Sequence, residues 1–213
     1  MAGLAQMAAD WTAQTLALPP ALQGRIQAQA VTMAASPLGA LPREPMRDAV
    51  YQSICLALAP QLGCTSSAQL AVQRTAGQAP QLLRNGQALP RLRLSISYAD
   101  AMAVWACTQE GIVGIDVQGL PGDAHTDIDA AGWPAVAALY LEPDAAAALA
   151  GLQDMAWQHG FAQQWARLEA QLKCAGLALA EAQARPAGWN AGMALWDLNS
   201  PAGPVALAWR AAA

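Results

Sequence analysis

The chain has 213 residues, of which 55% are hydrophobic and 12% are charged, whereas an average soluble domain has about 25% charged residues. The formal net charge of −4 argues against nucleic acid as a partner, because phosphate binding requires a basic face. The low charge does not indicate a membrane protein, because Gln, Asp, Arg and Pro interrupt every apolar run before it reaches the roughly 18 residues of a membrane span.

The N-terminal sequence has no lysine or arginine before Arg25 and so lacks the positive start of a secretory signal. We therefore expect a soluble cytoplasmic protein, with one large domain or two small halves that share a core. The cysteines have no CxxC spacing, which favours buried thiols over a zinc site; they are Cys55, Cys64, Cys107 and Cys174. His125 and His159 have no partner at metal-ligand spacing, and we interpret both as surface residues.

The first forty residues match no pattern that we can assign. The first clear element along the chain is a helix that follows them. In EPMRDAVYQSICLALAPQLG (44–63), Val50, Ile54 and Leu58 recur at helical spacing, and prolines lie near both ends. The segment RTAGQAPQLLRNGQALP (74–90) is interrupted by Gly and Pro, which indicates a loop.

Three strand patterns follow. RLRLSIS (91–97) alternates strictly, with apolar residues on one side and Arg and Ser on the other, which predicts a half-buried strand. The apolar runs AMAVWACT (101–108) and IVGIDV (112–117) are joined by QEG. This short connection predicts that the two runs form a hairpin.

The last part of the chain is expected to be helical from about Ala131 to Gly176, with breaks at Pro134, Pro143 and Gly160. It closes with MALWDL, a NSPAG turn and PVALAW (193–209), which predict a second hairpin. The order of helix, strands, helices and strands predicts an α+β fold with antiparallel strand pairs in each half.

One acidic residue interrupts the strand patterns. Asp116 stands at the end of an apolar run, between Ile115 and Val117. A desolvated carboxylate must be paired or must bind a metal, and Gly114 would allow another backbone or a ligand to approach closely. The alternative is an ordinary aspartate that caps the turn after the strand.

A line of three functional side chains marks the late helix. In QQWARLEAQLKCAGLALAE (163–181), Trp165, Glu169 and Lys173 follow at intervals of four and share one helix face, each roughly 6 Å from the next. The simple interpretation is a solvated Glu–Lys pair worth ~0.3 kcal/mol, with Trp165 at the edge of the core. Combined with Asp116, however, Glu169 could share one divalent cation, and Lys173 could hold a phosphate, which is the kind of site that Mg²⁺ prefers.

These segments in this order resemble the 4'-phosphopantetheinyl transferases, in particular the two-halved, surfactin-synthetase-activating type. The matching segments are RLRLSISYADAMAVWACTQEGIVGIDVQ (91–118) and QWARLEAQLKCAGLAL (164–179). GQAP (77–80) resembles the family's Gly-Lys-Pro loop, and MRDAVYQSICLAL (46–58) resembles its arginine-bearing first helix. The resemblance covers about two-thirds of the chain and depends on the pair GID and WxxxEAxxK, either of which would be a weak signal alone.

The resemblance implies a pseudo-twofold α+β fold with two similar halves, each with antiparallel strands and a long helix. The halves would be residues 1–108 on the nucleotide side and residues 109–213 with the metal-binding acid and the catalytic helix. The implied reaction moves the phosphopantetheine arm of coenzyme A onto a serine of an apo acyl or peptidyl carrier protein, with Mg²⁺, and releases 3',5'-ADP. Such enzymes serve polyketide, peptide or fatty acid synthesis and are usually monomers.

The resemblance also implies roles for individual residues. Asp116 and Glu169 would ligate Mg²⁺, and Lys173 would neutralise phosphate charge as the bond breaks. Glu169, or a metal-bound water that it orients, would take the proton of the serine. Trp165 would shape the site, and Arg47 would contact the phosphates of the nucleotide. Catalysis would then rest on charge neutralisation and in-line positioning.

At three positions the chain departs from the family pattern. The family's Ser-His-Ser reads Ser97-Tyr98-Ala here, so a tyrosine replaces a histidine that contacts a coenzyme A phosphate, although Ser97 and Tyr98 can both still offer hydroxyl groups. Gln78 stands where the loop usually has lysine, and Gln118 stands where a third acid is usual. We expect Arg91 or Arg93 to compensate for the lost positive charge, since they lie on the polar side of the strand that leads to Tyr98.

Two classes of function remain open. The first is an active, divergent transferase, which the retained Asp116, Glu169 and Lys173 favour, because a pure binding protein has little reason to keep a metal site. The second is a non-catalytic relative that binds a carrier protein or coenzyme A. A third possibility is an unrelated α+β protein.

Overall fold

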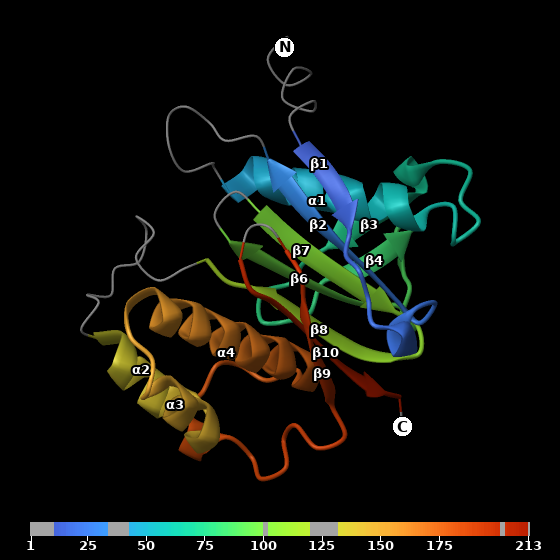
Figure 1. Cartoon of the computed structure of the whole chain (residues 1–213). Coiled ribbons are helices and arrows are strands. Elements are labelled where there is room, and N and C mark those ends of the chain that lie inside the picture. Colours follow the sequence, from blue (N-terminus) through green and yellow to red (C-terminus); the bar gives the residue numbers. More distant parts are fainter. Residues whose placement is uncertain (1–10, 34–42, 100–101, 120–131, 201–202, 213) are drawn as a thin grey trace.

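The computed structural model describes residues 11–33, 43–99, 102–119, 132–200 and 203–212, which form an α+β fold (Figure 1). The first sheet contains, in spatial order, β1 (Trp11–Thr15), β2 (Ile26–Met33), β7 (Met102–Thr108) and β6 (Arg93–Ala99). The second sheet contains β8 (Gly111–Val117), β10 (Val205–Ala211) and β9 (Ala194–Leu198). A small third sheet contains β3 (Leu70–Gln73), β4 (Gln81–Arg84) and β5 (Gln87–Ala88). All strand pairs described are antiparallel.

The helices differ greatly in length. The α-helices are α1 (Arg43–Leu58), α2 (Trp133–Tyr140), α3 (Pro143–Leu149) and α4 (Asp154–Ala175), and single 3₁₀ turns lie at Pro20–Leu22, Ser67–Gln69 and Ala182–Ala184. Helix α4 is capped after Ala175 by Gly176, whose left-handed backbone lets its N–H reach the last carbonyls of the helix. None of the described helices combines the length and the apolar character that crossing a membrane requires.

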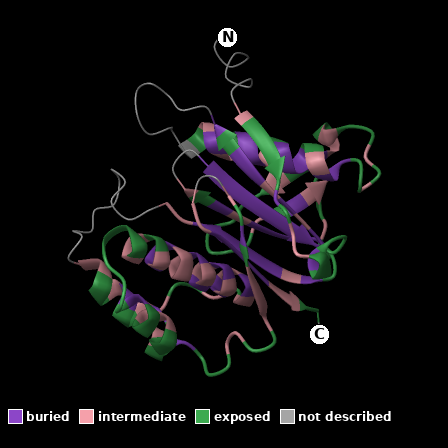
Figure 2. Cartoon of the chain, viewed as in Figure 1, coloured by how far each residue is buried: buried purple, intermediate pink, exposed green. Residues whose placement is uncertain are grey.

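The two larger sheets pack face to face, and each has a helix on its outer face. Apolar residues of α1, including Val50 and Ile54, contact one face of the first sheet. The other face of that sheet packs on β8 and β10 through residues such as Val104 and Ile115. Helix α4 covers the outer face of the second sheet, and α2 and α3 lie on the far side of α4 (Figure 1). Buried residues are therefore concentrated on the inner strands (Figure 2).

Helix α4 lies unusually close to the second sheet because the contact is made by small residues. Ala166, Ala170 and Cys174 of the helix pack against Ala206 and Ala208 of β10. On β8, a Cβ atom added to Gly114 would lie 2.0 Å from the carbonyl oxygen of Ala170. The helix backbone thus touches the strand backbone, which only a glycine permits.

Several sequence predictions are confirmed and others are wrong. The first helix, the strand at 91–97 and the hairpin of β9 with β10 are present, although α1 ends at Leu58 rather than Gly63. The predicted loop at 74–90 is wrong, because it contains β4 and β5. The predicted hairpin of residues 101–117 is also wrong, since β7 pairs with β2 and β6, whereas β8 pairs with β10. Periodicity identifies a strand but does not identify its partner.

Gly160 does not break the late helix, contrary to the prediction. Helix α4 runs through it, and a Cβ atom there would lie 2.9 Å from side-chain atoms of both Leu149 and Leu152. The glycine therefore makes room for the end of α3, and packing outweighs its low helix propensity. The break lies instead between α3 and α4. The predicted boundary at residues 108 and 109 falls in the turn between β7 and β8.

Substitution of Gly114 by alanine should test the close contact between α4 and β8. The added Cβ would lie 2.0 Å from the Ala170 oxygen and 2.6 Å from the Cys174 nitrogen, so the helix must move outward. We expect Gly114→Ala to lower the free energy of unfolding by about 1–3 kcal/mol or more in urea denaturation. Gly151→Ala is the matched control, because nothing lies within 4 Å of its added Cβ. Equal stability of the two variants would contradict the proposed contact.

Candidate active site

Asp116 is a fully buried carboxylate with three hydrogen-bond donors around it. Its Oδ1 accepts hydrogen bonds from the Ser97 hydroxyl and from Lys173 Nζ, each at 2.5 Å. Its Oδ2 accepts one from Gln118 Nε2 at 2.6 Å. A charge in this position requires such partners, because the protein interior solvates it far less than water does.

Helix α4 brings the predicted line of side chains to this carboxylate. The Trp165 indole N–H donates a hydrogen bond to Glu169 Oε1 at 2.9 Å, and Lys173 Nζ lies 3.9 Å from Glu169 Oε2. The same ammonium also contacts the Ile115 carbonyl oxygen at 3.3 Å. Asp116, Glu169 and Lys173 therefore meet at one place, as their sequence positions predicted, because Gly114 lets α4 approach the strand.

The environment of Glu169 favours its protonated form. Burial is the main cause that raises the pKa of Glu169, and the negative charge of Asp116 raises it further. Lys173 and the hydrogen bond from Trp165 act in the opposite direction without reversing the shift. Glu169 is thus a carboxylate that its surroundings make more basic than usual, a property of many catalytic acids and bases.

Trp165 is itself held by other aromatic rings. Its ring contacts Tyr140 edge-to-face, with ring centroids 5.7 Å apart, and lies against Phe161 at 5.4 Å. Trp157 stacks on the opposite end of this row, also against Phe161. The row fixes the indole so that its N–H points at Glu169.

A second polar cluster lies on the other face of β6. Because strand residues alternate, Tyr98 points away from the Ser97 side and towards α1. Arg47 and Tyr51 of α1 and Arg74, just after β3, are near enough for their charges to act on Tyr98. Partial burial is the main cause that raises the pKa of Tyr98 to about 12, although 38% of the residue stays exposed; Tyr51 raises it further, and the two arginines only partly offset the shift. Tyr98 is therefore a neutral hydrogen-bond donor beside two cations.

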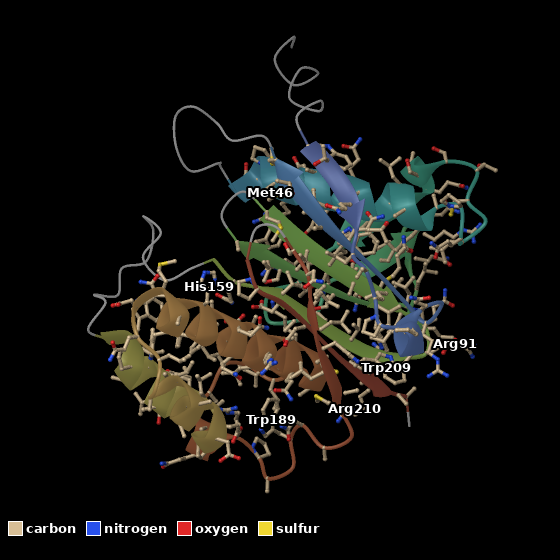
Figure 3. The ribbon with its side chains drawn as sticks, viewed as in Figure 1. Met46, Arg91, His159, Trp189, Trp209 and Arg210 are labelled. Atoms are coloured by element: carbon tan, nitrogen blue, oxygen red, sulfur yellow. The ribbon has the colours of Figure 1, made fainter. Side chains whose placement is uncertain are left out.

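The other predicted binding residues lie elsewhere. Gln78 is exposed in the turn between β3 and β4. The expectation that Arg91 or Arg93 serves Tyr98 is wrong, because Arg93 begins β6 and lies about 17 Å along the strand from Tyr98. Arg91 lies at the opposite end of the molecule from Met46, the neighbour of Arg47 (Figure 3).

Arg91 belongs to a different feature of the surface. It borders an apolar groove of about 260 Å³, together with Leu62, Leu89, Pro90, Leu92 and Gln109. Sequence reasoning overlooked Arg74, the first residue of the predicted loop, which directly follows β3 and acts on the pKa of Tyr98. It also did not foresee that the Ser97 side of β6 is buried against β8, where the Ser95 hydroxyl accepts a hydrogen bond from the Ile115 N–H.

His159 and the cysteines take no part in this site. His125 lies outside the described residues, and His159 is exposed on α4 (Figure 3). All four cysteines are unpaired, and three of them are buried, which confirms the expectation of buried thiols for Cys55, Cys107 and Cys174.

The donor set determines whether a divalent cation fits here. Among the described residues no three His, Cys, Asp or Glu side chains gather around one point, so a metal would have two protein carboxylates, Asp116 and Glu169. Mg²⁺ is often held by one or two carboxylates, with phosphate and water oxygens completing the shell. The two carboxylates flank one point, because Lys173 Nζ lies 2.5 Å from Asp116 Oδ1 and 3.9 Å from Glu169 Oε2. The residues fit Mg²⁺ if Lys173 leaves Asp116.

No protein-family model matches this sequence, and no curated protein matches it. The geometry of the described residues therefore supplies the argument about function.

Replacement of Glu169 by glutamine should change how stability depends on pH. The pKa of this acid is higher in the folded state than in the unfolded state. At a pH between these two pKa values, the folded state therefore binds more protons than the unfolded state. The protonated carboxyl group stabilises the fold fully when the pH is below the pKa of this residue in the unfolded state. That stabilisation is lost as the pH rises through its pKa in the folded state. Glutamine cannot ionise, so we expect the melting temperature of Glu169→Gln, relative to wild type, to increase from about pH 4 to about pH 8.

Glu181→Gln is the matched control for this measurement, because Glu181 is exposed and its side chain caps no helix. Its melting temperature relative to wild type should be the same across that range. A constant difference for Glu169→Gln as well would mean that Glu169 is not perturbed.

Proposed function

We propose that the protein transfers the 4'-phosphopantetheine arm of coenzyme A to a serine of an apo acyl or peptidyl carrier protein and releases 3',5'-ADP. The observation that carries the proposal is the meeting of Asp116, Glu169 and Lys173 in one partly buried cluster. The motif pair that resembles the 4'-phosphopantetheinyl transferases contains these residues, although Asp116 precedes Glu169 by 53 positions in the chain.

The arrangement of the two larger sheets is a second support. The resemblance implies two similar halves, each with antiparallel strands and one long helix. In this chain α1 covers the first sheet and α4 covers the second. In the proposal the first sheet serves the nucleotide and the second carries the chemistry.

Strand β6 offers a path for a long anionic ligand. Among the described strands it is an edge strand whose backbone pairs with β7 alone, and its consecutive residues Ser97 and Tyr98 face the two polar clusters. Coenzyme A carries a phosphomonoester at one end of its nucleotide and a diphosphate at the other. In the proposal the phosphomonoester contacts Arg47, Arg74 and Tyr98, while the diphosphate reaches Lys173.

The side chains of the cluster suit phosphoryl transfer. Lys173 would bind the diphosphate and balance the charge that develops on the leaving phosphate. Glu169, made more basic by burial, would accept the proton of the attacking serine hydroxyl. Mg²⁺ bound by Asp116 and Glu169 would supply further positive charge at the diphosphate. Trp165 and Gln118 would orient the two carboxylates through their hydrogen bonds.

A non-catalytic protein that binds coenzyme A or a carrier protein is the second candidate. The observation that favours it is the complete hydrogen bonding of Asp116 by Ser97, Lys173 and Gln118. In this alternative the cluster would be a buried ion pair that holds α4 on β8. The neutral Tyr98, which stands where the resembled family has a histidine, also favours the non-catalytic protein.

The deciding measurement is the mass of carrier proteins after incubation. We expect the purified protein, with coenzyme A and Mg²⁺, to add one phosphopantetheine group to the serine of at least one apo carrier protein from its own genome. Glu169→Gln should lower the rate by at least about 100-fold, the usual contribution of a positioned base, whereas Glu181→Gln should retain it. Tight binding of a carrier or coenzyme A without any adduct would support the binding protein instead.

Replacement of Trp165 by phenylalanine should separate the role of the indole N–H from that of the ring. The hydrogen bond from Trp165 lowers the pKa of Glu169, so its loss should move the acid limb of the transfer rate to higher pH. Phenylalanine retains packing against Tyr140 and Phe161. Trp157→Phe is the control, because Trp157 shares the aromatic row but donates no hydrogen bond to Glu169. An unchanged acid limb in Trp165→Phe would argue against Glu169 as the base.

A further inference from the structure

The only lysine among the 213 residues stands at the candidate site. The chain has ten arginines and one lysine, Lys173. Elsewhere arginine makes the ion pairs, as Arg167 does with Asp197 and Arg185 does with Glu142. A guanidinium forms a fixed, planar, two-point contact, whereas an ammonium is a compact charge on a flexible stem. The chain therefore places its single lysine at the candidate site, where a compact and movable positive charge would act differently from the fixed guanidinium of an arginine.

The ammonium of Lys173 occupies the space between the two carboxylates. Its Nζ lies 2.5 Å from Asp116 Oδ1 and 3.9 Å from Glu169 Oε2. Gln118 and Ser97 already donate hydrogen bonds to Asp116, so Lys173 supplies the positive charge that this buried group needs. A divalent cation shared by the two carboxylates would lie in the space that this ammonium occupies, and the repulsion between the two positive charges at such short distance favours displacement of the ammonium.

Lys173 has room to leave if another anion receives it. Its side chain is 31% exposed, whereas that of Asp116 is 1% exposed, so the ammonium can turn outward while the carboxylate cannot. Without a new partner this movement would separate a close ion pair. With a phosphate group at the mouth of the site, the ammonium exchanges one anion for another.

We infer that Lys173 is the resident cation of the Asp116–Glu169 pair in the free protein, and that a divalent metal and an anionic phosphate ligand enter together. The metal displaces the ammonium from Asp116, and the phosphate accepts it. Each ligand therefore strengthens the binding of the other, as thermodynamic linkage requires. This inference rests on the proposed function for the identity of the phosphate ligand but not for the displacement itself.

The first test measures metal binding without any phosphate ligand. Mg²⁺ is titrated calorimetrically into the full chain, as wild type and as Lys173→Met, Lys173→Arg and Arg167→Met. Lys173→Met removes the resident cation, so we expect it to bind Mg²⁺ at least tenfold more tightly than wild type, a difference of about 1.4 kcal/mol. Lys173→Arg retains a cation and should bind Mg²⁺ no more tightly than wild type.

Arg167→Met is the matched control. It removes one positive charge from the same helix, but this charge pairs with Asp197 on the surface, so Mg²⁺ binding should stay at the wild-type level. If Lys173→Met bound Mg²⁺ no more tightly than wild type, Lys173 would be only a structural partner of Asp116 and the inference would be overturned.

A second test uses the wild type and is valid even if Lys173→Met fails to fold. The melting temperature is measured alone, with Mg²⁺, with coenzyme A, and with both. We expect the rise with both ligands to exceed the sum of the separate rises, because each ligand stabilises the native state more when it binds more tightly, and each tightens the binding of the other. Where Lys173→Met folds, the excess should be smaller in that variant. Additive rises in the wild type would overturn the inference.

These outcomes separate the inference from the proposed function. Tighter Mg²⁺ binding by Lys173→Met without transfer to any carrier protein would support the displacement and reject the transferase. If the wild type transferred the group and Lys173→Met bound Mg²⁺ with the same affinity as wild type, the transferase would be supported and the displacement rejected.

Discussion

The contact on which the site depends is the backbone-to-backbone approach of α4 to β8 at Gly114. Ala170 lies so close to this glycine that no side chain fits between them, and the neighbouring positions of the interface are alanines and a cysteine. Because the helix lies this near the strand, Glu169 and Lys173, one residue before and three residues after Ala170, reach Asp116 on the strand. A bulkier interface would move the helix outward and separate the ammonium from the carboxylate.

The electrostatics of the cluster differ between its two carboxylates. Asp116 is fully buried but has three donors, so its charge is compensated. Glu169 receives one hydrogen bond, from Trp165, and burial and its neighbour Asp116 raise its pKa. Such an arrangement lowers the stability of the folded protein relative to a neutral side chain, and proteins commonly accept this cost at functional sites.

The two polar clusters are linked by one strand. Ser97 and Tyr98 are adjacent in β6, so the alternation of the strand sends one side chain to Asp116 and the other towards Arg47 and Arg74. Strand β6 also meets β8 of the second sheet, where Ser95 accepts a hydrogen bond from the Ile115 N–H and Ser97 donates one to Asp116. The position of β6 between the two sheets thus connects the two polar clusters.

The sequence by itself determined the local features. The spacing of Trp165, Glu169 and Lys173 dictates that they share a helix face, and Asp116 is recognisable as a carboxylate in an apolar strand, because these patterns depend only on the geometry of single elements. The α+β class followed for the same reason. Gly160 shows the limit: its helix propensity indicated a break, but packing against Leu149 decided otherwise.

Only the tertiary structure decided which elements meet. The sequence predicted that β7 and β8 would pair, whereas each found its partners in a different sheet. It also named Arg91 or Arg93 as the cation near Tyr98, whereas Arg47 and Arg74 are the arginines that act on it. In both cases a contact between segments far apart in the chain is set by the packing of two sheets and two helices around a common core, and the periodicity of one segment contains no information about the surface that will cover it.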